Sequence, residues 1–290
     1  MLKGHSQIFM PSLKEPEFFA SEMRVDRPER LPDTLEEYLA LFDAARADQL
    51  LGEASTSYLR SHTAAESIAA VAPGARIIAI LREPASLLRS AHLQYVQAVI
   101  ETEYDLRRAI ALEEDRRQGK NLPRHGFWPL SLQYSDHVRY VEQLRRYHTV
   151  FGREHVLVLI YDDFRADNDA TVRTVLRFLG VDDSSPLERA EANPTVGVRS
   201  QALHELVHTV AVGRGPVSRR VKEAVKLAIP RAPRRRLLTA LRRGVVYGAP
   251  PAVDEDLMNE LRQRFRGEVV ALGEYLGRDL VSLWGYGDVE

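Results

Sequence analysis

Three short runs of branched apolar residues constrain the fold of this chain more than any other feature. They cover Gln49–Ala54, Arg76–Leu81 and His155–Tyr161. Continuous β-branched runs of this length are typical of strands that are buried on both faces of a parallel sheet. Helical patterns lie between and after the runs, so the sequence predicts an α/β fold with a parallel sheet flanked by helices.

Four helices are predicted from apolar residues at helical spacing and from the residues that flank them. Their ranges are Leu87–Ile100, Tyr134–Tyr147, Asp169–Leu179 and Asp254–Leu276. Gly180 and Gly277 follow the last apolar positions of the third and fourth helices, as expected of glycines that end a helix. A length of 290 residues fits one large α/β domain, and we treat residues 1–290 as a single domain.

Composition excludes several classes of site. The chain has no cysteine, so it can hold neither disulfides nor cysteine-ligated zinc. His204 and His208 lie four residues apart, but no third ligand accompanies them, and we predict no metal site. No apolar run reaches the roughly 18 residues that span a bilayer. The polar and charged residues within Met1–Phe19 do not fit a signal peptide, so we expect a cytoplasmic protein. The preference for Arg over Lys suggests a GC-rich bacterial genome.

Positive charge is concentrated in one segment. Gly213–Arg243 contains eleven Arg or Lys and one acid, a balance of +10, so a net charge of −1 leaves −11 for the rest of the chain. Three prolines divide the surrounding range, 199–249, which predicts a basic helical insert or lid. The segment lacks the interleaved aromatic residues of a nucleic-acid surface, so we expect no nucleic-acid partner. A solvated face, a lid over an anionic substrate and a peripheral contact with a membrane or another anionic surface remain open as its role.

The segment Ala75–Tyr95 carries the clearest chemical signal. A buried strand ends at Leu81, Arg82 follows it, and Pro84 suits the first position of a helix that runs on past Ser90. Ligands of open parallel sheets bind beyond the carboxyl ends of the strands, and a helix N-terminus attracts anions. Arg82 and the Ser90 hydroxyl could therefore hold a phosphate. On spacing alone, an arginine in a salt bridge at the strand end is an equal alternative.

This segment resembles the 3′-phosphate-binding segment of sulfotransferases that use 3′-phosphoadenosine 5′-phosphosulfate (PAPS). In that family a strand leads to an Arg-x-Pro turn and a helix that carries a serine; Arg82, Pro84 and Ser90 match these positions. Glu83 stands where the family usually has Asn, which puts a negative charge near the phosphate. The resemblance implies PAPS as co-substrate, with Arg82 and Ser90 as its binding residues.

Three further segments resemble the same family in order and spacing. His5–Ala20 is similar to the stretch whose Lys-Glu-x-x-Phe-Phe motif supplies the general base in heparan-sulfate-type and bacterial carbohydrate sulfotransferases, and the resemblance implies that role for Glu15. Leu50–Leu59 resembles a Gly-Glu-Lys-Ser-x-x-Tyr segment, with Ala54 in place of the lysine. Val156–Val181 resembles a later strand, acidic turn and helix, where we expect Asp162 and Asp163 to cap or buttress the strand end.

One part of the family pattern has no match. The family's first strand leads into a loop whose backbone N–H groups and basic side chain hold the 5′-phosphosulfate. The only early glycine, Gly4, has no strand before it. We therefore expect an N-terminally truncated form of the P-loop NTPase-like sulfotransferase fold, most simply from a start codon placed too late. We expect residues 1–290 as printed to catalyse little or no transfer.

The resemblance implies an enzyme that moves a sulfuryl group from PAPS to a hydroxyl or amine of a carbohydrate, glycolipid or natural product. The alternative is a non-catalytic remnant that keeps the fold and serves as a binding or interaction module. The acceptor would be selected mainly by 102–130 and 199–249. The sequence predicts neither its identity nor the oligomeric state.

Overall fold

The computed structural model describes residues 2–23, 30–123, 129–184, 197–198, 247–248 and 250–287. The strands are β1 (Ile8–Phe9), β2 (Leu50–Leu51), β3 (Ile77–Leu81), β4 (Val156–Ile160), β5 (Gly197–Val198) and β6 (Tyr247–Gly248). The α-helices are α1 (Leu35–Leu39), α2 (Ala64–Val71), α3 (Pro84–Gln97), α4 (Leu106–Ala111), α5 (Glu113–Arg117), α6 (Tyr140–Phe151), α7 (Tyr161–Ala166), α8 (Asn168–Leu179), α12 (Glu255–Leu276) and α13 (Leu280–Leu283). The 3-10 helices are η1 (Leu2–Gly4), η2 (Ser21–Met23), η3 (Ala40–Phe42), η4 (Pro129–Leu132), η5 (Tyr134–Val138) and η6 (Arg153–His155).

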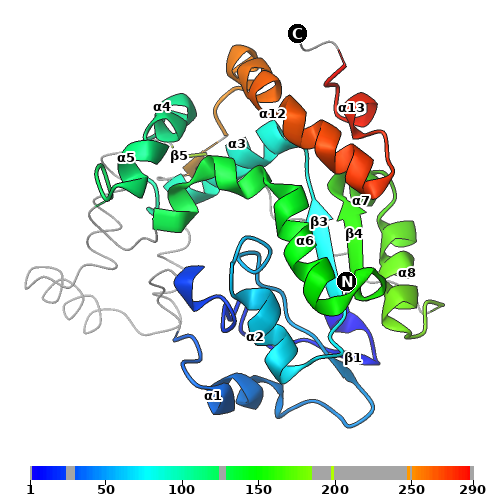
Figure 1. Cartoon of the computed structure of the whole chain (residues 1–290). Helices are drawn as coiled ribbons and strands as arrows, with labels where there is room; N and C mark the ends of the chain where they lie inside the picture. Colours follow the sequence, from blue (N-terminus) through cyan, green and yellow to red (C-terminus); the bar gives the residue numbers. More distant parts are fainter. Residues whose placement is uncertain are drawn as a thin grey trace, which may run out of the picture.

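The predicted parallel pairing is confirmed at the centre of the molecule, where β3 lies beside β4 (Figure 1). The register runs from Ile77 opposite Val156 to Leu81 opposite Ile160. β1 and β2 form a second parallel pair, and β5 and β6 pair antiparallel. Among the described residues these are three separate two-stranded sheets. The two-residue strand β1 was not predicted, because its apolar run, Ile8–Met10, is only three residues long.

One face of the β3–β4 pair forms the main core. Alternate residues of a strand share a face, so Ala79 and Leu81 lie on the same side as Ile160. These three pack in one buried cluster with residues of α6, α12 and the C-terminal turn: Tyr140, Leu144, Val269, Leu272, Leu280, Trp284 and Tyr286. Figure 1 shows α12 crossing the end of β3 and β4, with α6 alongside. This packing fixes the carboxyl end of β3 against two long helices.

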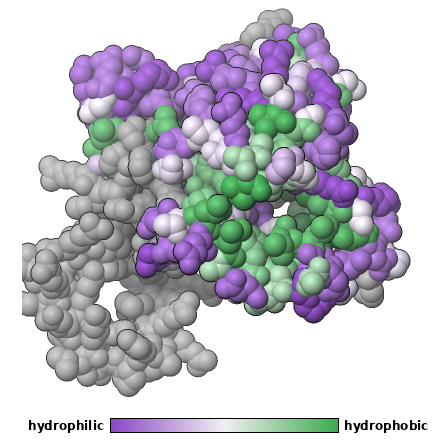
Figure 2. All heavy atoms as spheres, turned by 60° about the horizontal axis from the view of Figure 1, so that its bottom comes forward, coloured by the Kyte–Doolittle hydropathy of each residue, from purple (hydrophilic) through white to green (hydrophobic). Residues whose placement is uncertain are grey.

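The opposite face of the same strands is less covered by the described residues. Ile80 on this face is 52% exposed, and Ile78 is only half-buried. The two residues of β2, Leu50 and Leu51, are also exposed. Parallel sheets usually bury both faces, so this is an unusual amount of exposed apolar strand surface. On the face shown in Figure 2, apolar side chains gather around a hollow.

Caps set the helix ends where the sequence predicted them. Asp167 accepts the Ala170 N–H at the start of α8, and Asp254 accepts the Leu257 N–H at the start of α12. Gly180 and Gly277 end these helices with φ values of 69° and 65°, the left-handed conformation that glycine adopts without strain.

The second predicted helix, 134–147, is divided rather than continuous. Its first part is the 3-10 helix η5, and α6 begins only at Tyr140 and continues to Phe151. Arg139 between them has φ −75° and ψ 54°, which is not helical. The apolar spacing of residues 138–144 is compatible with both arrangements, so it could not show the break.

The predicted basic insert lies almost entirely outside the described residues. Of the range 199–249, only β6 is described. No helix within the described ranges is long and apolar enough to cross a bilayer.

Candidate functional site

The turn after β3 holds Arg82 in a defined position. Because Leu81 lies opposite Ile160, the next residues, Arg82 and Tyr161, meet at the carboxyl edge of the strand pair. The Arg82 guanidinium carbon lies 5.1 Å from the centroid of the Tyr161 ring, and its Nε donates to Ser86 Oγ at 2.9 Å. Among the described residues Arg82 forms no ion pair, and the contacts of its guanidinium, with Ser86 and Tyr161, leave its charge available to an anion.

Ser90 lies on the same side of α3 as the residue that orients Arg82. Ser86 and Ser90 are four residues apart, which places them one above the other on one helix face. Ser90 is half-buried. The structure therefore adds Ser86 to the two predicted residues. The spacing of four between positions 82, 86 and 90 was a signal for it that the sequence interpretation did not use.

Glu83 changes how an anion could bind at this turn. Its carboxylate accepts the N–H groups of Ala85 at 3.1 Å and Ser86 at 2.6 Å, and so fills the N-terminus of α3. Tyr286 donates its hydroxyl to the same carboxylate at 2.7 Å, and Arg262 Nε lies 3.9 Å away. A helix N-terminus was expected to attract an anion here, but the N–H groups of Ala85 and Ser86 already donate to Glu83. An anion here would depend on side chains, chiefly Arg82.

Glu15 lies in a backbone turn of unusual conformation. Glu15 has φ 48° and Glu17 has φ 50°, the left-handed region that residues with a Cβ seldom adopt. Each such residue costs roughly 1–3 kcal/mol, so it persists only where its surroundings impose it. Glu15 is half-buried and Glu17 is buried. Strained residues of this kind are often found at functional sites, which adds a physical observation to the resemblance.

A polar cluster links the Glu15 turn to α3. Tyr95 on α3 accepts a hydrogen bond from Arg60 Nη2 at 3.3 Å, and both Glu15 and Glu17 act on it electrostatically. Burial raises the pKa of Tyr95 above its ordinary value. The Glu15 turn therefore lies within electrostatic range of the C-terminal half of α3. Arg82 precedes the other end of this helix, which at 14 residues is about 21 Å long.

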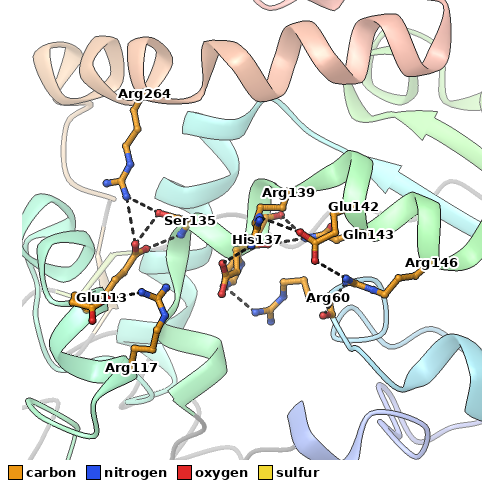
Figure 3. Close-up of polar contacts among 12 residues, drawn as sticks. Arg60, Glu113, Arg117, Ser135, His137, Arg139, Glu142, Gln143, Arg146 and Arg264 are labelled. Atoms are coloured by element: carbon orange, nitrogen blue, oxygen red, sulfur yellow. Dashed lines mark hydrogen bonds and ion pairs between the residues drawn. The ribbon is translucent and has the colours of Figure 1, made fainter.

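The hydrogen bonds described for the Arg60 guanidinium go to neutral groups. Its Nη1 lies 3.0 Å from His137 Nε2 and 3.5 Å from the carbonyl oxygen of Leu130 (Figure 3). His137 is buried, and burial together with the Arg60 charge holds the pKa of this imidazole well below its usual range. His137 therefore stays neutral near pH 7. Neither residue was singled out from the sequence, because they are 77 positions apart and match no motif.

The same view shows a second polar cluster, formed by Glu113, Ser135 and Arg264. Glu113 accepts hydrogen bonds from the backbone N–H and hydroxyl of Ser135 at 2.6 and 2.7 Å, and Arg264 donates to the Ser135 hydroxyl (Figure 3). This cluster ties α5 to η5 and α12. Because its polar groups bond one another, it has the character of a structural link.

An open groove of about 610 Å³ lies elsewhere, along α2 and α6. Its lining combines acidic and basic side chains, among them Glu66, Glu142 and Arg145, and includes none of the predicted site residues. Its charges are mixed, and none of its lining residues belongs to β3 or to the turn after it. No cluster of three or more potential metal ligands occurs among the described residues.

The acidic turn after β4 buttresses the strand end, as predicted. Asp162 accepts a hydrogen bond from Trp284 Nε1 at 2.9 Å, and Asp163 forms a two-point ion pair with Arg278. Hydrogen bonding from Arg278 lowers the pKa of Asp163. These contacts attach the C-terminal segment to the same edge of the strand pair that carries Arg82.

Comparison with known proteins identifies the fold and the family of the chain. The structure is similar to the crystal structure of a sulfotransferase from Alicyclobacillus acidocaldarius, with a TM-score of 0.65, 24% sequence identity, and coverage of 98% of this chain and 90% of that one. At this identity the likeness establishes the sulfotransferase fold. No curated protein matches the chain. The family model described as "Sulfotransferase family" matches residues 5–185, more than half of the sequence. The chain therefore belongs to the sulfotransferase family.

Proposed function

We propose that this protein transfers a sulfuryl group from PAPS to a hydroxyl or amine of a carbohydrate, glycolipid or natural product. Arg82 and Ser90 bind the 3′-phosphate of the donor, Ser86 holds the Arg82 guanidinium, and Glu15 is the general base. Membership of the family supports sulfuryl transfer in general. The donor, the acceptor class and the residue roles are our proposal.

The reaction needs one proton acceptor and one leaving group. The acceptor oxygen or nitrogen attacks the sulfur of PAPS, and the bond from sulfur to the bridging oxygen breaks. The electron pair of that bond leaves with 3′-phosphoadenosine 5′-phosphate (PAP). The proton of the acceptor passes to the Glu15 carboxylate. In-line transfer of this kind depends mainly on positioning and on stabilising charge, as in phosphoryl transfer.

The observation that carries the proposal is the state of Arg82. Its guanidinium is fixed by Ser86 and Tyr161 at the carboxyl edge of a parallel strand pair, and it forms no ion pair with a described carboxylate. A donor whose 3′-phosphate sits there and which extends along α3 would direct its sulfuryl group toward the turn that carries Glu15. The length of α3, about 21 Å, leaves room for a nucleotide between the two.

The test is nucleotide binding measured by calorimetry, since this measurement needs no acceptor. PAP should bind, and ADP, which lacks the 3′-phosphate, should bind much more weakly. Arg82→Met should weaken PAP by about tenfold to a hundredfold, because a charge-assisted hydrogen bond contributes about 1.5–3 kcal/mol.

Two controls accompany this measurement. Arg117→Met removes an exposed arginine of α5, 54% accessible, and should leave PAP affinity unchanged. Ser90→Ala should weaken PAP several-fold and leave ADP unaffected. Equal affinity of the wild-type chain for PAP and ADP would contradict the assignment of Arg82 and Ser90, and would favour a remnant of the fold that no longer binds donor.

A further inference from the structure

Glu53 follows β2 and contacts the turn that carries Glu15 through Ser55. Its Oε2 accepts a hydrogen bond from the Ser55 hydroxyl at 2.9 Å. Ser55 Oγ in turn accepts the backbone N–H of Glu17 at 3.1 Å. A single carboxylate thus orients the hydroxyl that binds one amide of the strained turn.

Tyr58 makes a second connection of the same kind. Its hydroxyl oxygen accepts the backbone N–H of Phe19 at 3.4 Å. The same hydroxyl interacts with Glu53, and burial together with this neighbouring carboxylate raises the pKa of Tyr58. Ser55 and Tyr58 therefore bind two amides, two residues apart, and both interact with Glu53.

The segments that carry Glu15 and Glu53 are also held together at the strands that precede them. β1 and β2 pair in parallel, with Phe9 opposite Leu51. A Cβ atom added at Gly52 would lie 2.9 Å from Met10 Sδ, so the two segments approach closely just before Glu53, and a larger residue there would require the Met10 side chain to shift. The Glu15 turn and the Glu53 loop consequently leave the strand pair side by side.

The burial of Glu53 and the charges around it agree with a close contact between its loop and the Glu15 turn. Burial raises the pKa of Glu53, the charge of Glu15 raises it further, and hydrogen bonds from Tyr58 and Ser55 oppose the rise. Glu53 is half-buried, at the base of the loop and within electrostatic range of Glu15. Loss of its acceptor oxygens would release the Ser55 hydroxyl and would remove the carboxylate that interacts with Tyr58.

We propose that Glu53 is a positioning residue for Glu15. Through Ser55 and Tyr58 it holds the turn in which Glu15 and Glu17 are left-handed, and so fixes the direction in which the Glu15 carboxylate points. This role rests on the proposed function, in which Glu15 receives the proton of the acceptor. Glu53 itself transfers no proton in this scheme.

Amide hydrogen exchange, measured by NMR on the full chain, tests the proposal directly. Glu53→Met keeps the size of the side chain and removes its acceptor oxygens, and it should speed exchange at both Glu17 and Phe19 by about tenfold or more. Ser55→Ala should speed exchange at Glu17 alone, and Tyr58→Phe at Phe19 alone. Glu53→Gln retains an acceptor oxygen and should restore most of the protection.

The control is Glu36→Gln, the same loss of charge at an exposed position of α1, which should change neither amide. Protection at both amides in Glu53→Met, or equal exchange in the Met and Gln variants, would overturn the positioning role. Calorimetry with PAP on the same proteins is independent. Absence of PAP binding by the wild-type chain would refute the proposed function and leave the exchange result standing. Normal PAP binding by Glu53→Met, with slow exchange at the Glu17 and Phe19 amides, would refute only the role of Glu53.

Discussion

The buried ion pair between Glu101 and Arg116 allows a quantitative prediction. Arg116 Nη1 and Nη2 each donate to one oxygen of Glu101 at 2.8 Å, and the side chains are 1% and 0% exposed. Tyr134 donates its hydroxyl to the same carboxylate at 3.0 Å. The pair closes the segment from residue 101 through α4 and α5, part of the range expected to select the acceptor.

Arg116→Met should lower the free energy of unfolding by about 3–5 kcal/mol, because it leaves a buried carboxylate without its cation. The expected loss is a large part of the 5–15 kcal/mol typical of a domain. The Thr102 and Glu103 N–H groups still donate to Glu101, so the lower end of the range is expected. The double variant Glu101→Gln/Arg116→Met removes both charges and keeps an acceptor for these donors, and should recover about 2 kcal/mol.

Urea unfolding followed by circular dichroism measures these differences. Arg117→Met, the neighbouring residue in an exposed pair with Glu114, serves as the control and should cost less than about 0.5 kcal/mol. The reasoning is refuted if Arg116→Met costs no more than Arg117→Met, or if the double variant is less stable than Arg116→Met alone.

Two further predictions concern charge at and near the site. Glu83→Asn keeps a side chain that can cap α3 and removes the negative charge beside Arg82. PAP should therefore bind about fivefold more tightly in calorimetry, a gain of about 1 kcal/mol in binding free energy. Unchanged or weaker binding would count against a phosphate at Arg82. His137 has a lowered pKa in the folded state, mainly through burial, so below pH about 6.5 the unfolded chain takes up a proton that the folded chain excludes. The free energy of unfolding should therefore fall as the pH drops below that value, by up to about 1.4 kcal/mol per pH unit. Urea midpoints measured at pH 7.5 and 5.5 should show a smaller loss in His137→Gln than in the wild type.

The sequence predicted the elements whose signal is local. The strands β3 and β4, the start of α3 at Pro84 and the glycine that ends α8 all follow from apolar pattern and backbone preference. The pairing of β1 with β2 could not be predicted in the same way, since each strand has only two residues and its stability comes from partners distant in sequence. Short elements of this kind depend on tertiary contacts rather than propensity.

The candidate site was predicted in part. Glu15, Arg82 and Ser90 were chosen from local motifs, and the structure places Arg82 at the strand end and Ser90 on the adjoining helix. Tyr161 comes from elsewhere in the chain and reaches Arg82 through strand register. Arg60 and His137, which contact Tyr95 on the same helix as Ser90, are also distant in sequence and match no local motif. The surroundings of the Glu83 carboxylate at the helix N-terminus could not be predicted, because Tyr286, which donates to it, lies 203 positions away in the sequence.

That contact between Glu83 and Tyr286 also has a consequence for the order of folding during synthesis. The two residues are separated by 203 positions, so the ribosome must add nearly the whole remaining chain before the cap of α3 is complete. At about 5–20 residues per second, this interval is roughly 10–40 seconds. During that time the turn with Arg82 and the exposed apolar strands would be present without their C-terminal cover. The nascent chain should therefore depend more on chaperones than its size alone implies, and shortening it by a few residues from the C-terminus should lower the yield of folded protein more than an equal deletion elsewhere.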